Sequence, residues 1–276
     1  MSVEQVSDHL ARAIRRYLEV CGEHRQFVTT ADPLKRRVEV RSKIWLPWIE
    51  YGGHAGRKSF CGPLPQAHAE AAIGLLKQLP LVERPVRSRD RFVDRCLLSD
   101  LAVEAGSGRS DEALIRLWVA AMMWGSGTSN GRGAWRTAQG LSSPRLASVL
   151  RETYEAVDAD DLVGAHQRFN LYGTGESFFT KWFWSVSLNN ASPRRRPLIL
   201  DQRVRDVLDR ILGQNDQWSQ PGGALGYATF VDLAHSCARE LGNGFEHVDA
   251  EKIEWLLFDR SNHDMVQEPC LAAWSI

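Results

Sequence analysis

One lysine lies within a helix-like segment that is otherwise apolar and aromatic. Lys181 stands inside the run FFTKWFWSV, with Phe178 and Trp184 three residues to either side and therefore on the same helix face. Partial burial among aromatic rings destabilises an ammonium ion and favours the neutral amine. A neutral amine can attack an electrophilic carbon and form a Schiff base. The alternative is a lysine whose stem packs on Trp184 while its ammonium group reaches water.

An aspartate follows twenty positions later, where an apolar run ends. Asp201 comes directly after the run PLIL and opens the segment DQRVRDVLDR. Aspartate is a preferred N-cap residue of helices, and capping alone would account for its presence. The same carboxylate could also stabilise a cationic transition state or deprotonate a nucleophile. Three consecutive arginines precede the apolar run and make this part of the chain locally basic: Arg194, Arg195 and Arg196.

Two glycines separate the helical pattern around Lys181 from the one before it. The sequence Gly173-Thr174-Gly175 permits positive φ and so allows a tight hairpin between two helices. The second helix is expected to begin near Glu176, and its first N–H groups and dipole can hold a phosphate without a basic side chain. The alternative is a helix–helix turn that binds no ligand.

Helical patterns dominate the segments that must position these residues. The clearest is DEALIRLWVAAMMW, with Ser110 as its N-cap and two acidic residues in its first turn. β-branched alternation is confined mainly to 28–50, which predicts a minor β element there. The fold is therefore predicted to be mainly α. Helices are expected near 3–21, 66–79, 111–124, 143–157, 159–170, 176–188, 201–213, 227–242 and 249–258.

Composition excludes several classes of protein. The chain has 276 residues, of which 43% are hydrophobic and 25% charged, the usual balance of a globular protein. No apolar run approaches the roughly 20 residues that a bilayer requires, so no membrane association is expected. Thirty-four basic and 34 acidic residues cancel, so attraction to nucleic acid must come from local patches. Five scattered cysteines predict a reducing, cytoplasmic location, and neither a metal nor another cofactor is expected.

The order of these features resembles that of a known superfamily. Hairpin glycines, a lysine on the next helix, a basic linker and an aspartate at a helix start occur in that order over 166–210. This order resembles the helix-hairpin-helix superfamily of DNA glycosylases, and in particular the branch with the 8-oxoguanine DNA glycosylase fold. The resemblance implies a two-lobed fold. Residues 1–99 would pack with the C-terminal helices of 197–276, and 100–196 would form a middle helical domain that ends in the helix-hairpin-helix.

The resemblance also implies a role for each motif residue. Asp201 would stabilise positive charge on the sugar or activate the nucleophile, and Lys181 would attack the sugar C1′ atom. In familiar members the lysine follows the second glycine by two residues, a position that Ser177 occupies here. Strand cleavage is therefore implied less strongly than base release. The hairpin residues 173–175 and the arginines 194–196 would bind the DNA backbone.

A base pocket is expected around the glycine-rich loop of residues 125–133. The faces of Trp124 and Trp135, which flank the loop, could sandwich an unstacked base, while Asn130 and Arg132 could read its polar edge. Trp184 is expected to belong to the same pocket. The alternative is a core tryptophan at a helix end followed by a surface loop.

The partner implied is double-stranded DNA with a modified base, bound by a monomer. The ten tryptophans, the glycine-rich loop and the divergent first hundred residues favour a bulky modified pyrimidine. Some bacterial relatives excise glucosylated hydroxymethylcytosine from phage DNA in anti-phage defence. Two alternatives stay open: an 8-oxoguanine repair glycosylase with lyase activity, and a non-catalytic helix-hairpin-helix DNA-binding protein.

Overall fold

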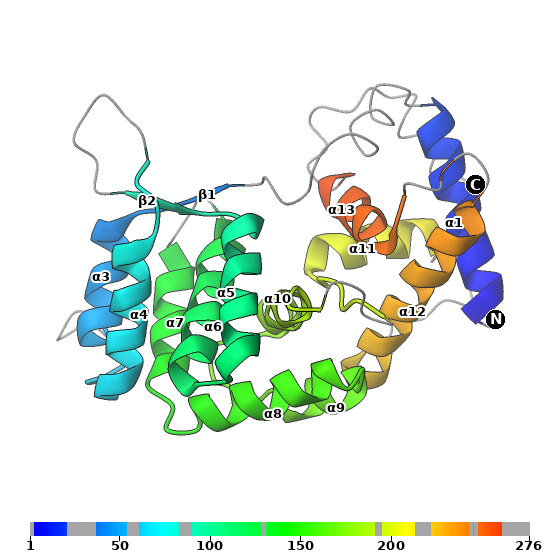
Figure 1. Ribbon diagram of the computed structural model, residues 1–276. Coiled ribbons are helices and arrows are strands. Elements are labelled where there is room, and N and C mark those ends of the chain that lie inside the picture. Colours follow the sequence, from blue (N-terminus) through cyan, green and yellow to red (C-terminus); the bar gives the residue numbers. More distant parts are fainter. Residues whose placement is uncertain are drawn as a thin grey trace. The chain divides into compact units, whose positions relative to one another are not determined.

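The computed structural model describes most of the chain and shows a mainly helical protein (Figure 1). The described residues are 3–20, 37–53, 61–82, 90–127, 131–190, 195–212, 222–242, 245 and 248–260. Within them lie twelve helices and two short strands, in agreement with the predicted fold class. The elements are α1 (Val3–Val20), β1 (Val38–Val40), α3 (Ser42–Tyr51), α4 (Gln66–Gln78), β2 (Arg91–Val93), α5 (Arg95–Gly108), α6 (Asp111–Gly125), α7 (Gly131–Leu141), α8 (Leu146–Asp158), α9 (Leu162–Arg168), α10 (Glu176–Ser187), α11 (Gln202–Leu212), α12 (Gly223–Leu241) and α13 (Ala250–Arg260).

The chain forms two compact units. A central unit comprises Leu34–Arg194, and a terminal unit combines Met1–Pro33 with Arg195–Ile276. The first boundary differs from the predicted one at 99/100. Residues 34–99 belong to the central unit because α4 and α5 pack on α6, and α3 packs on α7.

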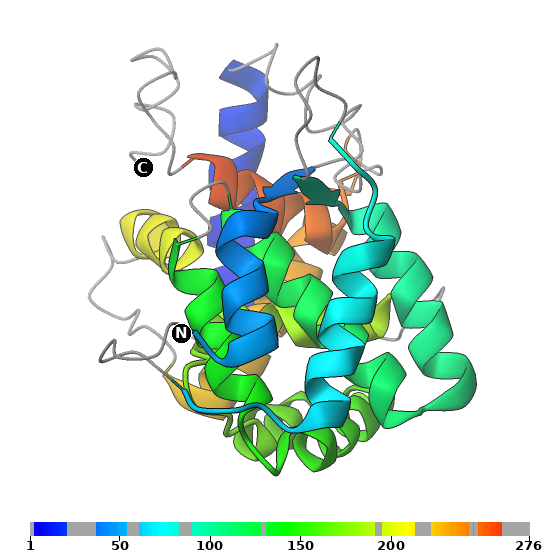
Figure 2. The same ribbon diagram turned by 90° about the vertical axis from the view of Figure 1, so that its left-hand side faces the viewer.

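Helix α6 is the core of the central unit. Eleven of its residues are buried, and they face every direction around the helix, as expected for a helix enclosed by others. Its neighbours are α4, α5, α7, α8 and α10. Figure 2 shows α3 and α4 side by side on one flank of this unit. Ser110 caps α6 as predicted, since its hydroxyl accepts a hydrogen bond from the Ala113 N–H at 3.2 Å.

A small antiparallel sheet pairs two three-residue strands of the central unit. Val38 lies opposite Val93 and Val40 lies opposite Arg91. The strand β1 falls in the predicted β region. Its partner β2 lies in a polar, basic segment whose alternation is too short to indicate a strand from sequence.

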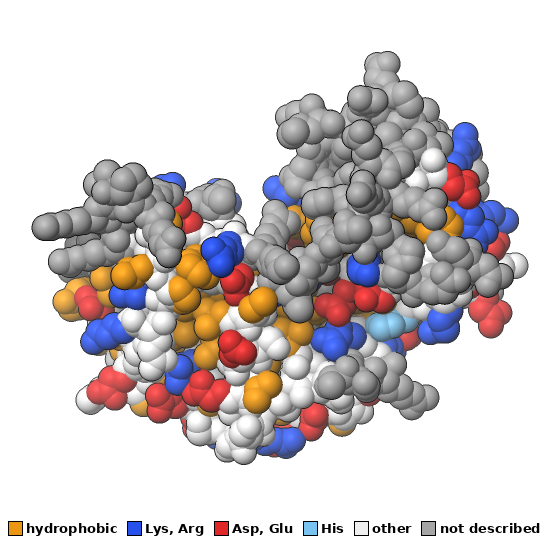
Figure 3. Space-filling view, turned by 45° about the horizontal axis from the view of Figure 1, so that its top comes forward, with side chains coloured by type: hydrophobic (Ala, Val, Ile, Leu, Met, Phe, Trp, Pro, Cys, Tyr) orange, Lys and Arg blue, Asp and Glu red, His pale blue; other side chains and the backbone are white. Residues whose placement is uncertain are grey.

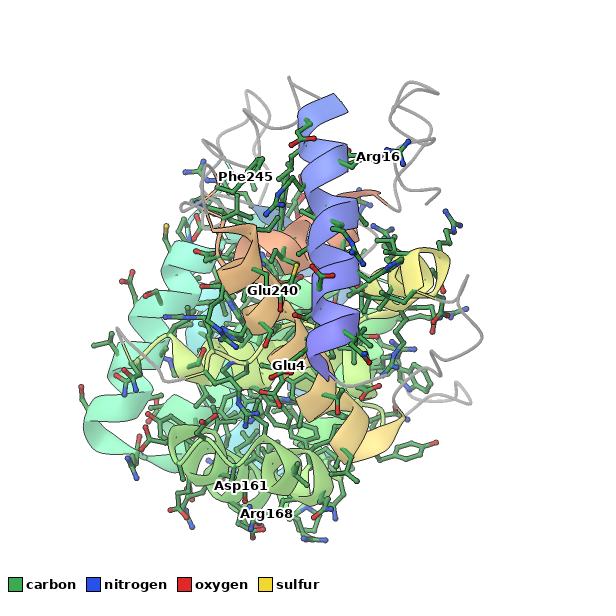
Figure 4. The ribbon with its side chains drawn as sticks, turned by 90° about the vertical axis from the view of Figure 1, so that its right-hand side faces the viewer. Glu4, Arg16, Asp161, Arg168, Glu240 and Phe245 are labelled. Atoms are coloured by element: carbon green, nitrogen blue, oxygen red, sulfur yellow. The ribbon has the colours of Figure 1, made fainter. Side chains whose placement is uncertain are left out.

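In the terminal unit, the amphipathic helix α1 packs along α12. The buried face of α1 includes Leu10, Ile14 and Tyr17. Arg15 Nη2 donates to the carbonyl of Glu240 at 3.1 Å, and Figure 4 shows Glu240 beside α1. Helix α13 completes the unit by packing on α11 and α12. No described helix is long and apolar enough to cross a membrane.

The contact between α7 and the core tryptophan Trp118 predicts a sensitive position. Gly140→Ala is expected to lower the free energy of unfolding by about 1–3 kcal/mol, because its Cβ would lie 2.4 Å from Trp118 Cη2. Denaturant titration followed by circular dichroism measures the change. The matched control is Gly74→Ala on α4, where the new Cβ meets no described atom within 4 Å. That variant is expected to gain roughly 0.5–1 kcal/mol, and equal losses in both variants would contradict the packing described.

Candidate active site

A tight hairpin joins α9 to α10 in the central unit. Gly173 has φ +80°, and a Cβ at this position would lie 2.5 Å from Gln139 Oε1 and 3.2 Å from the Arg136 carbonyl oxygen. Positive φ and close approach to α7 together explain the glycine. Gly175 is the N-cap of α10 and provides no side-chain cap. The first turn of α10 can therefore present N–H groups to an anion.

Side chains on both helices hold the hairpin closed. His166 Nε2 of α9 lies 2.9 Å from Glu176 Oε1 of α10, and the same imidazole meets Phe179 edge-on. Asp161 caps α9 and pairs with Arg168 at 3.1 Å (Figure 4). The N–H of Gly164 holds the pKa of the Asp161 carboxyl below its usual value. The His166 contacts therefore link α9 to α10 within the central unit.

Lys181 is buried, with 8% of its surface exposed. Its Nζ atom donates a hydrogen bond to the Ser177 carbonyl at 2.6 Å and lies 5.6 Å from the centre of the Phe178 ring. Its stem runs past Gly125, since a Cβ there would lie 2.6 Å from Lys181 Cδ. The ammonium group therefore turns back toward the first turn of α10. It reaches the backbone of Ser177, the position at which familiar members of the superfamily carry their lysine.

Two of the tryptophans predicted to form a base pocket are brought together inside the core. Trp124 and Trp184 stack with their ring centres 5.8 Å apart, and they are 8% and 0% exposed. The guanidinium of buried Arg95 lies 5.1 Å and 4.4 Å from the two ring centres. In this arrangement each indole contacts the other and Arg95. The two residues therefore fit the alternative of core tryptophans better than that of a base pocket. Arg132 is exposed on α7, and Asn130 lies outside the described residues.

The described arginines of the basic linker form ion pairs within the terminal unit. Arg195 pairs with Asp232 at 2.7 Å, and Arg196 pairs with Glu251 at 3.2 Å. Arg194 lies outside the described residues. Figure 3 shows Lys and Arg interspersed with Asp and Glu over the face that it presents. Positive charge near the linker is therefore partly neutralised by the protein itself.

Asp201 belongs to the terminal unit and caps α11. Its Oδ1 atom accepts hydrogen bonds from the N–H groups of Arg203 and Val204 at 3.0 and 3.2 Å. No described residue bonds its second oxygen, Oδ2. The buried run 198–200 fixes the backbone just before it, and Tyr227 donates to the Leu198 carbonyl at 2.9 Å. One oxygen therefore has a structural role and the other can take part in chemistry.

A cavity of about 390 Å³ opens beside the hairpin, entirely within the central unit. The sequence pointed to the hairpin and α10 residues of this lining, but nothing in it joined them to α7, which lies earlier in the chain. For the α7 side of the cavity, the sequence signal is the spacing of Trp135 and Gln139, which are four residues apart and therefore on one helix face. The lining residues are Trp135, Arg136, Gln139, Tyr172, Gly173, Gly175, Ser177 and Phe178.

Comparison with protein families decides the classification. The model of the 8-oxoguanine DNA glycosylase OGG-like protein family matches residues 66–258. The chain belongs to this family. The matched region runs from α4 into α13 and includes the hairpin, Lys181 and Asp201. No curated protein and no solved structure matched the chain.

Membership of the OGG-like family confirms the predicted relationship to DNA glycosylases, and DNA is the partner that the family implies. Helix α1, strand β1 and helix α3 precede the matched region. Among the described residues, no group of three or more His, Cys, Asp or Glu side chains could hold a metal ion.

The hairpin geometry predicts different effects for its two glycines. Gly173→Ala is expected to lower the free energy of unfolding by about 2 kcal/mol, because a left-handed residue with a side chain costs roughly 1–2 kcal/mol and its Cβ also meets Gln139. Gly175→Ala has ordinary φ and no described atom within 4 Å of the new Cβ, so it should lose only the roughly 0.5–1 kcal/mol that alanine costs at an N-cap. Thermal denaturation of the two variants tests this, and equal stability would show that the hairpin is built differently.

Proposed function

We propose that this OGG-like protein is a DNA N-glycosylase that excises a modified base and leaves an abasic site. The observation that carries the proposal is the family match, which spans both a buried hairpin lysine and a helix-capping aspartate with one unbonded oxygen. In the reaction the N-glycosidic bond breaks, its electron pair leaves with the base, and a nucleophile bonds to C1′.

Asp201 is the proposed catalytic carboxylate. Positive charge develops on the sugar as the bond breaks, and a nearby carboxylate stabilises that charge. Because Oδ1 is held by two backbone N–H groups, Oδ2 has a fixed orientation. The same oxygen could take a proton from the attacking water or amine.

Lys181 is the proposed nucleophile for a bifunctional reaction. Attack on C1′ requires a neutral amine, so Nζ must first lose a proton, while one remaining N–H can still donate to the Ser177 carbonyl. Base release by water is the alternative that needs no movement of Lys181.

The DNA backbone contacts proposed are the hairpin residues Gly173, Thr174 and Gly175 together with Arg194, Arg195 and Arg196. Support for the hairpin comes from the first turn of α10, which lacks a side-chain cap. The ion pairs of Arg195 and Arg196 would have to loosen for those side chains to reach phosphate. DNA affinity should therefore depend on salt but with a shallow slope.

For the substrate we propose a bulky modified pyrimidine, namely glucosylated hydroxymethylcytosine of phage DNA, and a role in anti-phage defence. Support for a polar contact to such a base comes from Arg132, which is exposed on α7. The specific observation that favours the alternative, 8-oxoguanine repair, is the description of the matching family.

The catalytic role of Asp201 can be tested on three DNA substrates. The native protein should form abasic sites in phage DNA with glucosylated hydroxymethylcytosine, and far fewer in the same DNA unmodified or in an 8-oxoguanine duplex. Asp201→Asn should reduce that rate by about two orders of magnitude or more while it keeps the helix cap, since asparagine caps equally well.

Asp249→Asn is the matched control, because Asp249 caps α13 in the same way through the Lys252 N–H at 2.8 Å. It should act like the native protein. Release of 8-oxoguanine alone would assign the protein to oxidised-purine repair. Binding to DNA without any product from the native protein would leave a non-catalytic DNA-binding protein.

The role of Lys181 is tested by borohydride trapping. If Lys181 forms the Schiff base, reduction should link the native protein covalently to substrate DNA, and Lys181→Gln should abolish the link. Lys77→Gln, an exposed lysine in the last turn of α4, is the control and should still be trapped. Base release without trapping would identify water as the nucleophile.

A further inference from the structure

Gly125 is a glycine that its own backbone does not require. It is the last residue of α6, and its φ is not positive, so any L-residue could adopt its conformation. The next residue, Ser126, is the C-cap and also has right-handed geometry, with φ −76°. Glycine within a helix is destabilising relative to alanine. The missing side chain must therefore serve a group that packs against this position.

The stem of Lys181 occupies the space that a side chain at Gly125 would fill. A Cβ there would lie 2.6 Å from Lys181 Cδ and 3.3 Å from Lys181 Cε, and the next nearest atom, Phe178 Cδ1, would be at 3.4 Å. By contrast, a Cβ at Gly74 of α4 or at Gly108 of α5 would meet no described atom within 4 Å. The absence of a side chain at the end of α6 is thus matched to the path of one lysine.

Groups before and after Lys181 on α10 direct its amine toward the first turn of that helix. Trp184 lies one turn after Lys181 on the same face, and its ring stacks on Trp124. The Arg95 guanidinium lies 4.4 Å from the centre of the Trp184 ring, so positive charge is already present on that side. In the other direction, Lys181 Nζ donates to the Ser177 carbonyl at 2.6 Å. The amine therefore lies about one helical turn, roughly 5 Å, before its own backbone position.

We propose that Gly125 is a positioning residue for Lys181. Because it leaves the path of the stem open, the amine lies beside residue 177 and is kept away from the tryptophan pair and from solvent. Ser177 and Phe178 both contact the ammonium group and both line the cavity beside the hairpin, so this path places the amine next to the wall of that cavity. The inference rests on the proposed function, in which this amine is the nucleophile, and adds the residue that sets its reach.

Nuclear magnetic resonance can locate the amine without any substrate. Lysine labelled with ¹³C at Cε gives one resonance for each lysine of the intact protein, and Lys181→Gln identifies the resonance of Lys181. The Lys181 ammonium group lies 5.6 Å from the centre of the Phe178 ring, so the ring should shift this resonance away from that of exposed Lys77. Gly125→Ala should move it to the Lys77 position, because the new Cβ displaces the stem from the ring.

Two alanine variants of other glycines are the matched controls. Gly140→Ala strains the core of the same unit, since its Cβ would lie 2.4 Å from Trp118 Cη2, and Gly74→Ala meets open space. Both should keep the native Lys181 resonance. Gly125→Ala should fold, because its φ suits alanine and the stem that it meets is flexible. If that variant nevertheless fails to fold, a native Lys181 resonance at the position of an exposed lysine would still overturn the inference.

Borohydride trapping then tests the effect on the reaction. Gly125→Ala should lower the trapping rate about a hundredfold, since misplacing a reacting group by about 1 Å can cost that much. Gly140→Ala and Gly74→Ala should be trapped like the native protein, which separates positioning of the amine from a general loss of stability. Gly125→Ala with an unmoved resonance or an unchanged trapping rate would contradict the proposal.

The failure of this inference can be distinguished from the failure of the proposed function. A native protein that is never trapped, although Gly125→Ala moves the Lys181 resonance, would overturn the role of Lys181 as nucleophile and leave the positioning of its amine in place. Trapping of the native protein and of Gly125→Ala at equal rates would overturn the positioning role alone.

Discussion

The C-terminal end of α6 determines where α10 and its lysine, Lys181, lie in the central unit. Trp124 stacks on Trp184 of α10, and Gly125, the next residue, leaves the space that the stem of Lys181 fills. The ring of Trp124 thus positions α10, and the absence of a side chain at Gly125 leaves the path that the stem of Lys181 follows. The hairpin and the cavity depend on this contact, because the first turn of α10 forms part of each.

Local features of the fold were predictable from sequence, because they depend on neighbouring residues. The Ser110 cap, the hairpin at residues 173–175 and the helix start at Asp201 all follow from short motifs. The mainly helical class follows from periodicity. The packing of residues 34–99 on the central helices could not be predicted from sequence, because it depends on which apolar faces meet in three dimensions.

The candidate site was predictable only in part, for the same reason. Burial of Lys181 follows from its aromatic neighbours, but the direction of its ammonium group depends on a missing side chain at Gly125. A sequence cannot tell whether Trp124 and Trp184 line a pocket or fill a core, since the same residues suit both. The ion pairs of Arg195 and Arg196 join residues far along the chain.

The terminal unit is discontinuous, and this has a consequence for synthesis on the ribosome. Helix α1 is made before the central unit, but its partners α11 and α12 lie about two hundred residues later, as the contact of His9 with the Ile211 carbonyl shows. The central unit is complete in one stretch and can fold while the chain is still growing. Throughout that time the apolar face of α1 has no native partner, so α1 is buried only after the later helices α11 and α12 have been made.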